Sequence, residues 1–131
     1  GTQIEITSDE KIRLLSRAND NDAAIIRTST NPLNAGSWHY LVALFDYSND
    51  KIELYIDGGL INSFTSVGYS QNYSSIYPSR SSALGAEDNA SADFYNGLGD
   101  EFRVARAPRT AGWIKTEYDN QLNQSAFISA A

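Results

Sequence analysis

Two adjacent carboxylates, Asp100 and Glu101, are the residues of this 131-residue chain whose spacing first suggests chemistry. Acid–base catalysis or metal binding by the pair would need both side chains on one side of the chain. Residues 98–104 alternate between apolar and polar, and Asp100 shares the apolar parity with Leu98 and Val104. Successive side chains of a strand point to opposite faces, so the pattern predicts a strand whose two carboxylates face apart.

A carboxylate on the core side of a strand must be hydrogen-bonded, or its charged form becomes too costly. The expected donors for Asp100 are backbone N–H groups before Pro108 or the Trp113 indole. Thr110 offers an N-cap for a short helix that ends at about Tyr118. We therefore predict structural roles for Asp100 and Trp113, as a latch between the last strand and this helix, and a ligand contact is the alternative.

Glu53 and Asp57 are the other pair of acids whose spacing could place them on one face of a strand. At four residues apart in an extended chain they lie about 13 Å from each other. Glycoside hydrolysis needs carboxyl groups about 5 Å apart, or somewhat more for inversion. The sequence therefore predicts that the protein is not an enzyme.

Two loops are rich enough in carboxylate and amide oxygens to hold calcium, which takes six to eight oxygen ligands. They are residues 19–22 and residues 87–93. The proposed calcium ligands in the second loop are Glu87, Asp88, Asn89 and Asp93. The alternative for both loops is that Asn and Asp simply form turns.

A long loop over residues 66–82 is rich in Ser and Tyr, and loops of this length are usually functional or mobile. Flat aromatic faces and planar polar groups suit sugar recognition, and the same mixture suits protein recognition. The candidate ligand-binding residues are Tyr69, Gln71, Asn72, Tyr73, Tyr77 and Arg80. The alternative is that these tyrosines only cover the sheet.

Composition limits the partners of the chain. Its net charge of −6 argues against nucleic acid, which binds basic faces. Its longest apolar run, residues 40–45, is far too short for membrane insertion. There is no Cys, which excludes disulfides and thiolate metal sites. The length and apolar content are those of a single domain, residues 1–131.

Short β-branched and aromatic runs between turn residues predict the elements that carry these side chains, and they indicate an all-β sandwich or barrel. Residues 37–46 are apolar on both parities, so we expect a central strand covered on both faces. Asp57-Gly58 predicts a tight hairpin within residues 51–64. The remaining strands are expected at residues 4–6, 12–15, 23–28, 83–85 and 98–104.

Five motifs in order resemble the bacterial laminin G-like domains of the concanavalin A-like lectin/glucanase superfamily. They are Trp38-His39, ELYIDG (53–58), LG (84–85), FYNGLGDEFRV (94–104) and PRTAGWIKTEYDNQ (108–121). The resemblance covers about residues 3–127. It implies an antiparallel two-sheet jelly-roll sandwich, a structural role for His39, and calcium near the sheet rim, which favours the loop at 87–93.

The resemblance also implies a function. We expect a secreted or cell-surface, non-catalytic module that binds carbohydrate or mediates adhesion. The alternatives are a structural or protein-interaction domain of a larger surface protein and, more remotely, a glycoside hydrolase. Family members usually carry further N-terminal strands before the point where this sequence starts. We therefore expect the C-terminal part of a larger domain, or a reduced variant, whose open strand edges pair in a homodimer.

Overall fold

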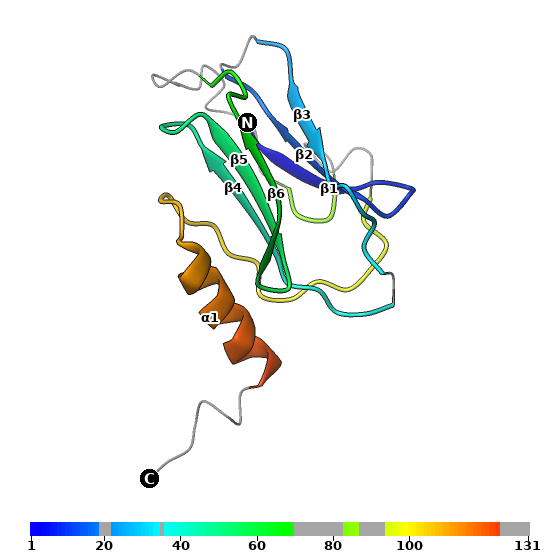
Figure 1. The fold of residues 1–131 in the computed structure, drawn as a ribbon. Helices are drawn as coiled ribbons and strands as arrows, with labels where there is room; N and C mark the ends of the chain where they lie inside the picture. Colours follow the sequence, from blue (N-terminus) through cyan, green and yellow to red (C-terminus); the bar gives the residue numbers. More distant parts are fainter. Residues whose placement is uncertain (19–21, 35, 70–82, 87–93, 124–131) are drawn as a thin grey trace.

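The computed structural model describes residues 1–18, 22–34, 36–69, 83–86 and 94–123, which form two antiparallel sheets and one helix (Figure 1). The first sheet contains β1 (Gln3–Ile6), β2 (Ile12–Ser16) and β3 (Ile25–Thr28). The second contains β4 (Leu41–Asp46), β5 (Lys51–Ile56) and β6 (Gly59–Thr65). In each sheet the strands follow the chain order, so the middle strands are β2 and β5. The predicted all-β sandwich is confirmed.

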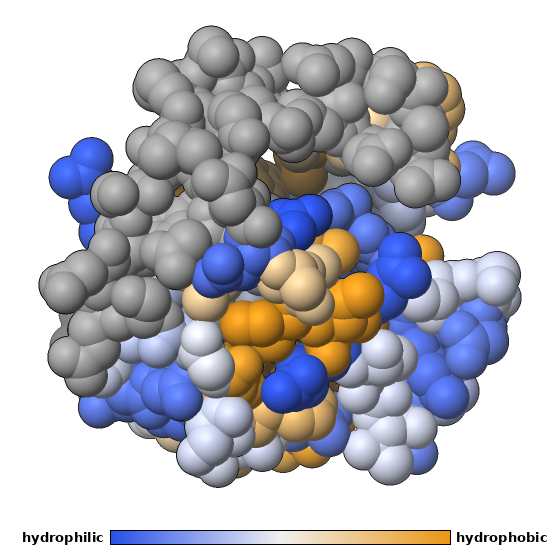
Figure 2. Space-filling view, turned by 90° about the horizontal axis from the view of Figure 1, so that it is seen from above, coloured by the Kyte–Doolittle hydropathy of each residue, from blue (hydrophilic) through white to orange (hydrophobic). Residues whose placement is uncertain are grey.

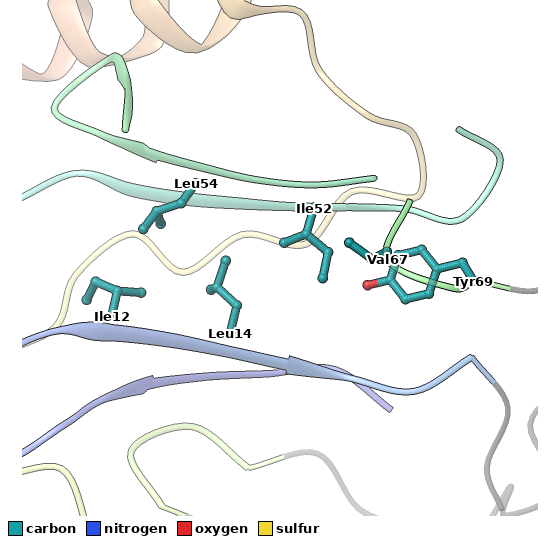
Figure 3. Packing of buried hydrophobic residues seen from close by; sticks show 6 residues of the cluster. All are labelled: Ile12, Leu14, Ile52, Leu54, Val67 and Tyr69. Carbon is teal, nitrogen blue, oxygen red and sulfur yellow. The ribbon is translucent and has the colours of Figure 1, made fainter. Parts of the chain in front are cut away.

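The core lies between the two middle strands. Ile12 and Leu14 of β2 point toward Ile52 and Leu54 of β5, and all four are fully buried (Figure 3). Their spacing of two residues puts each pair on one face of its strand. The two middle strands thus show the alternation of buried and less buried residues that is typical of strands in a sandwich.

The hairpin between β5 and β6 forms at the predicted turn. Asp57 and Gly58 both have positive φ, 53° and 76°, and Ile56 pairs with Gly59 across the turn. Two consecutive positive-φ residues are what a two-residue hairpin with the twist of its strands requires. A bulge between Leu54 and Tyr55 then shifts the register of β6 against β5.

The single helix among the described residues, α1 (Ala111–Leu122), lies on the side of the second sheet that faces away from the core (Figure 1). The Thr110 side chain accepts a hydrogen bond from the Trp113 backbone N–H, 3.2 Å long, so the predicted N-cap is confirmed. The helix runs four residues past the predicted end. Ile114 is fully buried, whereas Trp113 stays 40% exposed beneath the Arg109 guanidinium. No described helix has the length and apolar content to cross a membrane.

Two predictions about the strands are wrong: which segments form strands, and where β4 lies in its sheet. Residues 98–104 form no strand, and residues 83–85 form none either. Without a neighbouring strand the apolar parity of this segment has nothing to pack against, and Val104 is 83% exposed. The second error concerns β4, which among the described strands lies at the edge of its sheet and not at the centre that its two apolar faces predict.

Candidate functional site

The start of the long Tyr-rich loop, residues 66–69, is anchored to the sandwich; we call these residues the loop base. Asp50, in the turn between β4 and β5, accepts hydrogen bonds at Oδ1 from the backbone N–H groups of Gly68 (2.8 Å) and Tyr69 (2.6 Å). Asp50 has φ of 50°, a conformation that Asp tolerates better than most residues. One carboxylate oxygen thus holds two consecutive residues of the loop base.

Tyr69 joins the loop base to both sheets. Its ring stacks on Tyr47 with centroids 4.0 Å apart, and its hydroxyl lies 2.6 Å from Ser16 Oγ at the end of β2. Burial raises the pKa of the Tyr69 hydroxyl above its ordinary value. The prediction that Tyr69 offers its ring to a ligand is wrong, because the side chain belongs to the core and is only 8% exposed.

The other residues predicted for ligand and metal binding lie outside the described part of the chain. These are Gln71, Asn72, Tyr73, Tyr77 and Arg80 for the ligand, and Glu87, Asp88, Asn89 and Asp93 for calcium. Within the described ranges, no three His, Asp or Glu side chains gather where they could hold a metal ion.

A second polar cluster joins two of the sequence motifs. His39 Nδ1 lies 2.8 Å from Oδ2 of Asp57, and His39 Nε2 lies 3.1 Å from the Asn34 carbonyl oxygen. The other Asp57 oxygen accepts the Tyr40 backbone N–H at 2.9 Å. His39 therefore ties the β5–β6 turn to the start of β4, which is the structural role expected for it.

Both ring nitrogens of His39 face an acceptor, so both are satisfied only when both carry a proton. The hydrogen bond to Asp57 raises the pKa of His39, partial burial opposes this, and the Asn34 carbonyl adds to the rise. The imidazolium is thus the form that this environment favours, which suits a structural ion pair better than a general base.

Polar contacts also attach the helix, in addition to the buried Ile114. The Tyr40 hydroxyl donates to Glu117 at 3.0 Å, and Glu117 also pairs with Arg103. Burial, followed by the Glu117 hydrogen bond, raises the pKa of Tyr40 to about 12. Glu101 pairs with the same Arg103 guanidinium, as a surface partner. The two adjacent carboxylates, Asp100 and Glu101, do not act together. In the described contacts, Asp100 Oδ1 accepts the backbone N–H of Glu101, whereas the Glu101 side chain pairs with Arg103.

The expectation that Asp100 faces the core is wrong. Asp100 is exposed, because the strand that would turn it inward does not form. No described hydrogen bond joins it to Trp113 or to the backbone before Pro108, so its stabilising role stays a prediction. Glu53 and Asp57, the other acids considered for catalysis, have separate partners: Glu53 pairs with Lys51, and Asp57 with His39.

A hollow of about 3420 Å³ lies along β1, β4, residues 94–109 and α1, and sequence reasoning missed it. Its walls carry apolar residues that stay exposed, among them Trp38, which is 69% exposed. The end of the molecule also carries an open apolar patch bordered by hydrophilic side chains (Figure 2). In the sequence, the only pattern that indicated such an apolar surface was that of β4, which has apolar residues on both of its faces.

Comparison with known proteins agrees with this architecture. The family model Laminin_G_3, described as the concanavalin A-like lectin/glucanases superfamily, matches residues 1–115. A search of curated proteins finds no match. One solved structure with a similar fold is the 2.1 Å crystal structure of an S-layer domain-containing protein (residues 221–444) from Clostridium thermocellum ATCC 27405.

That S-layer chain shares 21% sequence identity with this one, with a TM-score of 0.51, and the match covers 89% of this chain and 55% of the other. This chain thus spans about half the length of its structural relative. At this identity the likeness concerns the fold alone. Together with the family match over residues 1–115 and the two antiparallel sheets, it leads to one conclusion: the chain belongs to the laminin G-like family of the concanavalin A-like lectin/glucanase superfamily.

Proposed function

We propose that this domain is a non-catalytic module that binds carbohydrate through its Tyr-rich loop, in a secreted or cell-surface protein. The observation that carries the proposal is the anchoring of the loop base. Asp50 holds its backbone, and Tyr69 fixes it to Ser16 of the opposite sheet. A recognition loop on a rigid sandwich is a common way to build a binding site, because the scaffold limits the entropy lost on binding.

The comparisons support the class of this function. The matched family is described by its lectins and glucanases, and the solved relative is named for an S-layer domain. The name of that relative supports the proposed surface location by analogy. Analogy of fold does not carry a ligand with it, and the ligand must be tested on the loop itself.

The test is glycan binding by the whole chain and by loop variants. Tyr73→Ala and Tyr77→Ala each remove a ring proposed to stack on a sugar, and we expect roughly tenfold weaker binding, about 1.4 kcal/mol, from either. Tyr95→Ala is the matched control, because Tyr95 is an exposed tyrosine outside the loop. Thermal unfolding should be the same for all variants. Unchanged affinity in both loop variants would place the sugar elsewhere.

Protein interaction is the second candidate, and the exposed apolar residues around the hollow favour it. A glycan array without binders, together with specific binding of a surface protein, would replace the first proposal by this one. Release of reducing sugar from β-glucans by the purified chain would instead establish a hydrolase.

We propose, on chemical grounds alone, that Glu87, Asp88, Asn89 and Asp93 supply ligands to a calcium ion. Carboxylate and amide oxygens are the donors that calcium takes. The ion is given no role in chemistry.

A further inference from the structure

The outer edge of β4 is unusual for an exposed strand. β4 reads LVALFD, which is apolar at five consecutive positions, and within the described residues only β5 pairs with it. Soluble proteins protect exposed edges with charged residues, Pro, bulges or a covering segment. Here the first charged residue is Asp46, at the end of the strand, and it bonds to Asn49.

The other sheet edges are protected. β3 carries Arg27, whose guanidinium lies over the Phe64 ring, and β1 carries Glu5, paired with Arg13 of β2. β6 interrupts its apolar residues, among them the exposed Leu60 and Ile61, with the polar pair Asn62 and Ser63. Only β4 among these edges has the composition of a strand with neighbours on both sides.

Both faces of β4 carry apolar residues. Leu41, Ala43 and Phe45 pack against the core. Val42 and Leu44 lie on the opposite face, where they pair with Tyr55 and Glu53 of β5. A strand that is apolar on both faces is typical of the interior of a sheet, yet the fold places β4 at the rim.

The hollow beside this edge carries more exposed apolar surface than a monomer usually shows. Its described walls include residues that are at least 66% exposed: Trp38, Leu84, Phe94, Leu98, Phe102 and Val104. Stable complexes bury about 800 Å² on each partner, which strand pairing alone does not reach, and these side chains supply the additional apolar area.

Charge favours a second copy as the occupant. Although the whole chain carries −6, the described walls of the hollow hold five arginines and six carboxylates, a net charge of −1. Two copies can therefore meet here with little electrostatic repulsion.

We propose that β4 pairs antiparallel with β4 of a second copy of this chain across a two-fold axis. The two second sheets then form one continuous six-stranded sheet, and the exposed apolar residues of each hollow are covered. A two-fold interface uses the same patch on both partners, and antiparallel pairing of a strand with its own copy has this symmetry.

The test is the mass of the intact 131-residue chain by sedimentation and light scattering over a range of concentrations. We expect a dimer that dissociates on dilution. Leu44→Lys should raise the dimer dissociation constant at least tenfold, because two lysines would meet near the axis. Within one copy the new Lys faces Glu53, so the fold should tolerate it. Ile61→Lys, on the other edge of the same sheet, is the matched control and should leave the dimer unchanged.

A cross-linking experiment keeps the proposal testable if Leu44→Lys unfolds. The chain has no cysteine, so Leu44→Cys introduces a unique thiol. Mild oxidation should give a covalent dimer from Leu44→Cys and not from Ile61→Cys. A chain that stays monomeric at all concentrations would overturn the proposal, and so would a dimer that cross-links at position 61 and not at 44.

Discussion

The imidazole of His39 and the carboxylate of Asp57 are joined by a hydrogen bond of 2.8 Å between residues 18 positions apart. The only histidine of the chain thus meets the acid of the β5–β6 hairpin turn. The same carboxylate holds the Tyr40 backbone, so one side chain fixes both the turn and the entry to β4.

Stability should depend on the charge of His39. The pKa of His39 is raised in the folded state above the ordinary 6.5. The stabilisation of the fold by the charged imidazole is therefore fully present below about pH 6.5. It is lost as pH rises through the higher folded pKa. We expect the free energy of unfolding to fall by about 1 kcal/mol across this range, measured by urea unfolding at several pH values.

The control for this pH effect is Asp57→Asn, because Asn also tolerates the positive φ of the turn. It removes the charge that favours the imidazolium, and the pH dependence near neutrality should flatten. A slope that persists unchanged in both Asp57→Asn and His39→Gln would assign the effect to another group.

Gly58 should not tolerate a side chain. Its φ is +76°, and a Cβ there would lie 2.9 Å from Cδ1 of Tyr118 on α1. Gly58→Ala combines backbone strain with this clash, and we expect a loss of about 2 kcal/mol in thermal or urea unfolding. Gly36→Ala, at φ +90° with open space around it, should show only the strain. Equal losses at both positions would mean that the helix contact is unimportant.

The Tyr69 hydroxyl should contribute to stability. Tyr69→Phe keeps the ring on Tyr47 but leaves the buried Ser16 hydroxyl without its described partner, at a cost of about 1–2 kcal/mol. Tyr95→Phe, at a half-exposed tyrosine, should change the free energy of unfolding by less than about 0.5 kcal/mol. Denaturant unfolding of the two variants measures the difference. A neutral Tyr69→Phe would show that Ser16 finds another partner.

Asp50 and Asp100 should differ in importance. Asp50→Asn weakens a charge-assisted bond to two backbone N–H groups, and we expect about 1 kcal/mol of destabilisation. Asp100→Asn changes an exposed residue, and its free energy of unfolding should stay within about 0.5 kcal/mol of the parent. A large loss at Asp100 alone would restore the latch that its sequence context predicts.

Calcium binding should appear as a higher melting temperature. A ligand that binds only the folded state at a hundred times its dissociation constant stabilises it by about 2.7 kcal/mol. Asp88→Asn should reduce this gain, and Asp22→Asn, in the other acidic loop, should leave it intact. A melting temperature that does not respond to calcium in the parent chain would remove the proposal.

The sequence by itself determined the features that depend on neighbours in the chain. Alternation placed Ile52 and Leu54 inside, the Asp-Gly turn closed the β5–β6 hairpin, and Thr110 capped the helix. Each follows from local backbone preference or from side-chain periodicity, which need no distant partner.

Tertiary structure decided which strands have neighbours. Residues 98–104 have the alternation of a strand, yet a strand exists only where another backbone pairs with it, and the described part of the chain supplies none. For the same reason Asp100 is exposed, Tyr69 is buried, and β4 lies at an edge although both its faces are apolar. Hydrogen bonding between distant segments is set by the whole fold, and alternation along one segment cannot encode it.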